Sequence, residues 1–131
     1  MPLKCDGYMA LLFVKDIKRS REFYENVLGL EFEHGDDNSA AFILGPDALL
    51  LLNHGGADDL LSPADVEHGA SRGGASSVIV TSVDDVDALY EELLAKGVEF
   101  IRAPEDRWWG KRCAHFKDPD GNVWEIHTNK E

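Results

Sequence analysis

The sequence contains two copies of one short pattern, and this internal repeat constrains the fold more than any other feature. Val14-Lys15-Asp16-Ile17 is echoed by Val83-Asp84-Asp85-Val86, and Gly29-Leu30-Glu31-Phe32 is echoed by Gly97-Val98-Glu99-Phe100. From aspartate to glycine the interval is 13 residues in the first copy and 12 in the second, so one helix fits each interval. A pattern that occurs twice indicates a duplicated supersecondary module and not a solenoid.

The first copy predicts a strand, a helix and three further strands. Residues 8–14 are apolar and precede Asp16, which is a good N-cap for a helix that Gly29 ends. Residues 30–33, 40–44 and 49–52 are expected to be strands, because turn-forming residues separate them. The first module, at about residues 5–53, is therefore βαβββ.

The second copy predicts the same order at about residues 77–129. Residues 77–83 are expected to be a strand, and either Asp84 or Asp85 caps the helix that follows. Further strands are predicted at residues 99–102, 112–117 and 123–127, the last two joined by the tight turn Asp118-Pro119-Asp120-Gly121. Between the modules, residues 54–76 are read as a linker with a short helix at 63–67.

Composition excludes several classes of function. The chain has 13 Lys and Arg against 25 Asp and Glu, and its net charge of −12 argues against nucleic acid or an anionic membrane as partner. No apolar run approaches the ~20 residues of a membrane span, and the N-terminus does not read as a signal peptide. The two cysteines, Cys5 and Cys113, form no Cys-x-x-Cys pair, so a cytoplasmic location is expected.

The modules also carry the motifs of a known family. Phe23-Tyr24 begins five residues before Leu28-Gly29-Leu30, and Asp118-Pro119-Asp120-Gly121-Asn122 leads to Glu125. With the paired βαβββ modules, these motifs resemble the vicinal oxygen chelate superfamily, which includes glyoxalase I, extradiol dioxygenases, fosfomycin-resistance transferases and bleomycin-resistance binding proteins. Trp109-Gly110-Lys111-Arg112 looks most like the bleomycin- and mitomycin-resistance branch. The resemblance implies an α+β fold over residues 1–131 as a single domain, with two modules forming a cup-shaped mixed sheet.

The same resemblance implies a divalent metal in the cup, with ligands from the first and last strand of each module. The matching positions in this sequence are Met9, Val78, the leucines at 49–52, and Glu125. Of these only Glu125 is a metal ligand, and one ligand does not hold Mg²⁺, Mn²⁺ or Ni²⁺. We therefore expect no cofactor. The alternative is a rearranged zinc site, since strand parity puts Glu125 and His127 on one face and similarity to the fosfomycin transferases adds His115 and Cys113.

The ligand site is expected to combine apolar walls with a polar anchor. Met9, Phe42 and Leu50 are predicted as walls, and one of Trp108 and Trp109, the latter preferred, as a ring that stacks on a planar ligand. Cys113 and His115, which the resemblance places facing the cup, are predicted as further ligand-binding residues. Trp124 has the opposite parity to Glu125 and is expected to pack under a helix. Glu125 either binds a cationic ligand, acts as a base, or forms an internal salt bridge with Arg112 or Lys111.

The sequence thus favours a cytoplasmic binding protein that sequesters a hydrophobic or cationic small molecule without a metal. A metal-dependent lyase, transferase or dioxygenase with a rearranged ligand set is the first alternative. A metal-free enzyme with Glu125 or His115 as base is the second, and a nucleophilic Cys113 activated by His115 is a further one. The family resemblance also implies a homodimer.

Overall fold

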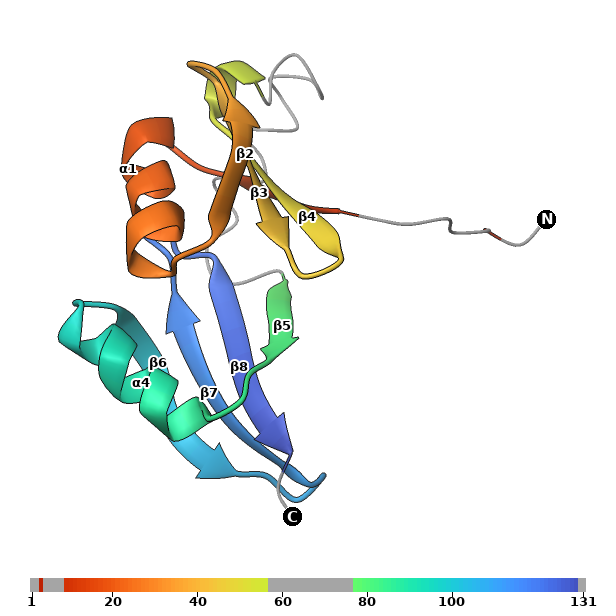
Figure 1. Ribbon diagram of the computed structural model, residues 1–131, viewed down its shortest axis with the longest axis vertical. Helices are drawn as coiled ribbons and strands as arrows, with labels where there is room; N and C mark the ends of the chain where they lie inside the picture. The colour runs from red at the N-terminus through yellow and green to blue at the C-terminus, as the bar shows by residue number, and fades with distance from the viewer. Residues whose placement is uncertain (1–2, 4–8, 57–76, 130–131) are drawn as a thin grey trace. The chain divides into compact units, whose positions relative to one another are not determined.

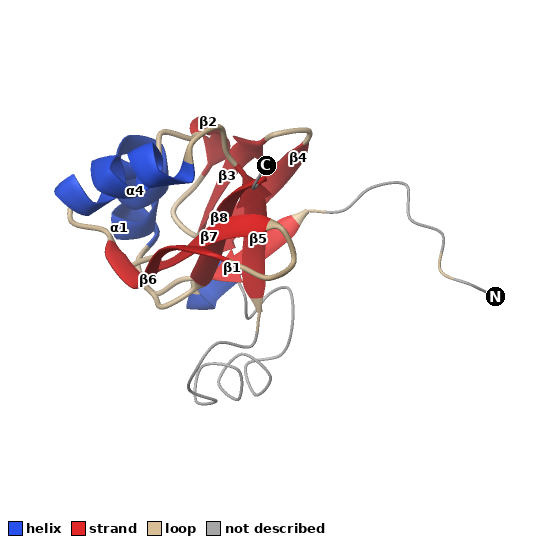
Figure 2. Cartoon of the chain, turned by 90° about the horizontal axis from the view of Figure 1, so that it is seen from below, coloured by secondary structure: helices blue, strands red, loops and turns tan. Residues whose placement is uncertain are grey.

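The computed structural model describes residues 3, 9–56 and 77–129, and its chain forms two compact units, Met1–Gly73 and Gly74–Glu131 (Figure 1). Each unit contains one four-stranded mixed sheet with helical structure on one face (Figure 2). The order βαβββ predicted for both modules is confirmed. The arrangement of the two sheets as one cup stays a prediction, and the helix predicted at 63–67, like Cys5, lies outside the described residues.

Unit one has the strand order β1-β4-β3-β2, with β1 parallel to β4 and the other neighbours antiparallel. The strands begin and end close to where turn residues and the apolar runs predict. The elements are β1 (Ala10–Phe13), α1 (Ile17–Glu22), η1 (Phe23–Val27), β2 (Glu31–Gly35), β3 (Ser39–Leu44) and β4 (Asp47–Leu52).

The helical segment of unit one changes its pitch half-way along. Asp16 caps α1 as predicted, and its carboxylate accepts a hydrogen bond from the Arg19 amide at 3.2 Å. The chain then widens into the π-helical turn η1, in which the Leu28 amide donates to the Phe23 carbonyl at 2.9 Å. The adjacent rings of Phe23 and Tyr24 are both buried, with centroids 5.1 Å apart in an edge-on contact.

Unit two repeats this plan with the strand order β5-β8-β7-β6, in which β5 runs parallel to β8. Asp85, and not Asp84, caps its helix by accepting a hydrogen bond from the Ala88 amide at 3.1 Å. The second strand of the unit, predicted at residues 99–102, extends to Asp106, because Pro104 lies on an edge strand where its missing N–H costs little. The elements are β5 (Val78–Ser82), α4 (Val86–Ala95), β6 (Glu99–Asp106), β7 (Lys111–Lys117) and β8 (Val123–Asn129).

Helix α4 covers one face of the unit-two sheet. On that face Trp124 is 2% exposed and its ring stacks on Phe116, with the ring planes 3° apart and the centroids separated by 6.1 Å. The prediction that Trp124 packs as core is confirmed.

Arg112 of β7 joins the sheet to α4 through two hydrogen bonds of 2.8 Å to the Asp87 carboxylate. This guanidinium lowers the pKa of Asp87. The opposite face of this sheet, which α4 does not cover, carries the side chains of the candidate site.

No helix among the described residues combines the length and the apolar character needed to cross a membrane.

Candidate functional site

A tight turn fixes the hairpin that carries the candidate site. Asp118 is 5% exposed, and its carboxylate accepts hydrogen bonds from the amides of Asp120 and Asn122 and from the Asn122 side chain, at 2.9, 2.8 and 2.9 Å. Gly121 follows at φ +85°, a conformation that favours glycine. The predicted turn is therefore confirmed, and its hydrogen bonds set the register between β7 and β8.

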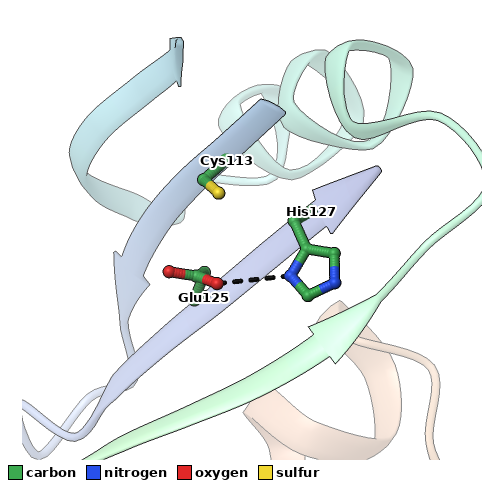
Figure 3. A group of neighbouring side chains, drawn as sticks. All are labelled: Cys113, Glu125 and His127. Carbon is green, nitrogen blue, oxygen red and sulfur yellow. Dashed lines mark hydrogen bonds and ion pairs between the residues drawn. The ribbon is translucent and has the colours of Figure 1, made fainter. Parts of the chain in front are cut away.

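That register brings four chemically active side chains together on the face away from α4. Cys113 lies opposite His127, and His115 lies opposite Glu125. Because alternate residues of a strand share a face, the four positions form the corners of a rectangle on two neighbouring strands. Figure 3 shows three of them, Cys113, Glu125 and His127, gathered on β7 and β8. The sequence predicted this shared face, which the register confirms.

Glu125 is held between two imidazoles. Nε2 of His115 lies 2.9 Å from one carboxylate oxygen, and Nδ1 of His127 lies 3.2 Å from the other (Figure 3 draws the second bond). The three side chains keep 15–19% of their surface exposed, so solvent reaches the group without surrounding it. The site is therefore a partly sheltered carboxylate whose orientation two neighbours fix.

Of the roles left open for Glu125, the internal salt bridge with Arg112 or Lys111 does not form. Arg112 has the opposite parity and pairs with Asp87 and Asp106, and Lys111 bonds to the Asn129 side chain. The sequence placed His127 on the Glu125 face by strand parity and His115 there by resemblance, but it did not assign either imidazole as a partner of Glu125.

The environment of Cys113 opposes its use as a nucleophile. The side chain is fully buried. Burial raises the pKa of the Cys113 thiol, and the Glu125 charge raises it further. A nucleophilic Cys113 was an alternative that required His115 to lower this pKa, and the pKa is raised instead. His115 engages Glu125 instead, and its Nδ1 atom is buried with no hydrogen-bond partner among the described residues.

Apolar side chains border the carboxylate. Val80 of β5 pairs with Glu125, and Val78 pairs with Val123, so both valines share the face of the site. They are 54% and 47% exposed. The face of the unit-two sheet that α4 does not cover, called the open face below, thus combines exposed valines with the Glu125 carboxylate.

The residues predicted as ligand walls in unit one lie on two different faces. Leu50 pairs with Ala41, whereas Phe42 pairs with Leu49 on the opposite side of the sheet. Phe42 is 1% exposed and its ring lies 6.0 Å from that of Tyr24, under the helical segment. Phe42 therefore belongs to the core, and its prediction as a ligand wall is wrong, whereas Leu50 as a wall stays a prediction. Met9, 55% exposed, immediately precedes β1.

The predicted stacking tryptophan is available at the surface. Trp109 lies in the turn between β6 and β7 and is 48% exposed, and its neighbour Trp108 is 91% exposed. The two rings meet edge-on with centroids 5.3 Å apart, and the Arg107 guanidinium lies 5.6 Å from the Trp109 ring. Trp109 as a ligand-stacking residue stays a prediction.

Comparison with known proteins decides the family. Residues 7–126 match the family model of the Glyoxalase/Bleomycin resistance protein/Dioxygenase superfamily. The chain belongs to this superfamily. Among its relatives in sequence is the uncharacterized protein YraH of Bacillus subtilis, which is 36% identical over 121 residues. The alignment covers 88% of this chain and 92% of YraH. Metallothiol transferase FosB of Lysinibacillus sphaericus is 28% identical over 119 residues, 90% of this chain and 79% of FosB.

Solved structures of the superfamily share the fold. A glyoxalase/bleomycin resistance protein/dioxygenase from Nocardioides has a TM-score of 0.77 at 25% identity, covering 98% of this chain and 87% of that one. A family enzyme from Burkholderia phytofirmans has a TM-score of 0.80 at 23% identity, covering 92% and 96%. The α+β fold predicted from the motifs is thus confirmed.

The ligand positions that the superfamily resemblance assigns do not make a metal site in this chain. Met9 and Val78 are exposed apolar side chains, residues 49–52 are leucines, and Glu125 alone can bind a metal. That set does not fit a divalent ion. A different set lies within unit two: one ligand atom each from Cys113, Glu125 and His127, all within 4.8 Å of one another.

Proposed function

We propose that this chain is a small-molecule binding protein of the superfamily, and that it holds a hydrophobic or cationic ligand against the open face of the β5-β8-β7-β6 sheet. The observation that supports this function is the Glu125 carboxylate, which is hydrogen-bonded to His115 and His127 and bordered by the exposed Val78 and Val80. Ligand sites commonly combine apolar lining with a few fixed polar groups. The net charge of −12 adds a general attraction for cations.

The carboxylate is prepared for a ligand in two respects. Its two oxygens offer about four acceptor positions, of which the imidazoles engage two. Because His115 and His127 already fix its orientation, little side-chain freedom is lost when a ligand binds. The partial burial also lowers the local dielectric, which strengthens an ion pair with a ligand cation. This mode of binding uses no metal.

The biological setting belongs to the same proposal. The free Cys113 thiol is consistent with a reducing compartment, which supports a cytoplasmic location. Sequestering a toxic compound there would serve antibiotic resistance, the role that the name of the superfamily associates with bleomycin.

The test is a binding measurement on wild type and Glu125→Gln. Calorimetry with bleomycin and a set of planar aromatic cations is expected to show a ligand that wild type binds and the variant binds poorly. Loss of one partner of a desolvated charge pair costs ~2–5 kcal/mol, which is roughly a 30- to 5,000-fold loss of affinity. Glu99→Gln, which changes an exposed glutamate at the start of β6, should bind as wild type does.

Thermal melts separate binding from a structural role. We expect Glu125→Gln to remain folded, since the amide oxygen still accepts a hydrogen bond from an imidazole. If the melting temperature falls sharply while the affinity of every bound compound is unchanged, Glu125 is structural and the proposed site is wrong.

A metal-dependent lyase, transferase or dioxygenase is the second candidate function. Two observations favour it: the similarity to FosB, which is a metallothiol transferase, and the convergence of Cys113, Glu125 and His127. Turnover that depends on added metal, measured with a thiol as co-substrate, would establish this enzymatic function in place of binding alone.

A further inference from the structure

We infer that Cys113, Glu125 and His127 form a zinc site on the open face of the unit-two sheet, with ligands that differ from those of the superfamily resemblance. The inference shares Glu125 with the proposed function and otherwise rests on separate observations. All three residues come from the adjacent strands β7 and β8. A site built on paired strands is held more rigidly than one built on loops.

The donor atoms select the metal. Cysteine sulfur, imidazole nitrogen and carboxylate oxygen are the three ligand types that Zn²⁺ takes in proteins. A thiolate disfavours Mg²⁺ and Ca²⁺, which prefer oxygen ligands. The mixed set of Cys113, Glu125 and His127 therefore fits zinc better than the ions of the usual oxygen-rich sites.

The spacing of the donors also fits. In a tetrahedral site with bonds of about 2.0–2.1 Å, neighbouring nitrogen and oxygen ligands lie about 3.3–3.4 Å apart. Nδ1 of His127 and the nearer Glu125 oxygen lie 3.2 Å apart, so these two donors hold nearly that spacing already (Figure 3). All three ligand atoms lie within 4.8 Å of one another. The Cys113 sulfur therefore has only a short distance to close.

His115 positions the carboxylate. Its Nε2 lies 2.9 Å from the Glu125 oxygen that does not face His127. A hydrogen bond thus holds one Glu125 oxygen, and the other oxygen is available to the ion. Hydrogen bonds of this kind commonly orient carboxylates that bind metals. His115 is thus a positioning residue for the zinc site and not one of its ligands.

Three protein ligands leave a fourth coordination position. Because Glu125 and His127 remain 18% and 15% exposed, a water molecule or an added ligand can reach it. Zinc and a cationic ligand would compete for the same carboxylate. The metal-loaded protein is therefore expected to exclude aromatic cations and to accept compounds with a thiolate or carboxylate donor.

The test is cobalt and zinc titration of the full chain after removal of metal by a chelator. Wild type is expected to bind one equivalent of Co²⁺, with intense visible bands of tetrahedral cobalt and a near-ultraviolet sulfur-to-cobalt band, and one equivalent of Zn²⁺ should displace the cobalt. Cys113→Ser should lose the sulfur band, and His127→Gln should lose stoichiometric binding. His115→Gln should weaken the affinity by about 10- to 100-fold.

Matched controls exclude adventitious binding. Cys5→Ser removes the other cysteine, and His34→Gln removes an imidazole of β2 whose side chain is 72% exposed; both should bind metal as wild type does. Circular dichroism checks that each variant is folded, and Cys113→Ala repeats the test if Cys113→Ser is not. Wild type that binds no stoichiometric metal, or a sulfur band that survives in folded Cys113 variants, overturns the inference.

The two proposals fail separately. If the metal-free protein binds an aromatic cation, and a separate titration shows no stoichiometric metal uptake, the zinc site is refuted and the proposed function stands. Stoichiometric metal binding through Cys113, with no small molecule bound by the metal-free protein, does the reverse.

Discussion

At the scale of single residues, Asp118 determines how accurately the site is built. It is not one of the residues of the proposed site, yet three donors of the turn converge on its buried carboxylate. The turn joins the strands on which His115 and Glu125 must be opposite each other. A one-residue slip in that register would move Glu125 to the face covered by α4.

Asp118→Ala is therefore expected to lower both stability and site integrity. Leaving a buried donor without its partner costs about 1–3 kcal/mol, and the free energy of unfolding in urea should fall by at least that amount. Asp118→Asn, which keeps one acceptor oxygen, should lose less. Asp37→Ala, in an exposed loop, serves as the control. An unchanged urea midpoint for Asp118→Ala would show that the turn forms without its carboxylate.

At the scale of elements, the duplication is repeated in the helix caps. Asp16 and Asp85 occupy equivalent positions of the two copies, and each accepts a hydrogen bond from the amide three residues later. The carboxylate satisfies one of the amides that the first turn leaves unpaired, and it also interacts favourably with the helix dipole.

The adjacent aspartates of the second copy allow a matched test of the cap. Asp85→Ala is expected to destabilise the protein by about 1 kcal/mol, within the ~0.5–2 kcal/mol measured for such caps. Asp84→Ala changes an exposed neighbour of equal charge and should have little effect. Chemical unfolding of both variants gives the comparison. Equal losses would mean that net charge near the helix, and not the capping hydrogen bond, is responsible.

The sequence predicts elements well wherever a local signal marks their ends. Aspartate caps, glycine stops and the Asp118 turn located two helices and most strand boundaries, and strand parity grouped Glu125 with His127. The widening of the helix at η1, where Phe23 and Tyr24 are both buried, has no such local signal. The face of Phe42 was mispredicted for a related reason. Four consecutive leucines at 49–52 lack the alternation that fixes which side of β4 is buried.

The partners of Glu125 depend on register, which lies beyond local patterns. From sequence alone Arg112 and Lys111 are plausible cations for this carboxylate, since they are the nearest basic residues of the hairpin. Pairing of His115 with Glu125 requires knowing which residues of β7 and β8 lie opposite each other. The sequence grouped Cys113 with Glu125 and His127 as possible zinc ligands, and the register shows that Cys113 lies opposite His127.

At the scale of the whole molecule, each unit leaves apolar side chains exposed on the sheet face that its helix does not cover. In unit one these include Phe13 and Ile43, which are 39% and 37% exposed, and in unit two Val78 and Val80. Exposed apolar clusters on a folded protein favour contact with a ligand or a partner chain. The strong negative charge opposes association of two copies of the chain. Assembly is thus a balance between apolar contact and electrostatic repulsion.

We propose that the chain forms a two-fold homodimer of about 29 kDa, twice the 14.5 kDa of one chain. Because each copy carries a charge of −12, repulsion between them should weaken the dimer at low ionic strength. The Debye length shortens from about 30 Å at 0.01 M salt to about 10 Å at 0.1 M, so added salt should strengthen association. Sedimentation velocity at micromolar concentration, at both salt concentrations, measures this shift. A 14.5 kDa monomer in both conditions would contradict the dimer, and a dimer insensitive to salt would place its interface away from the acidic surface.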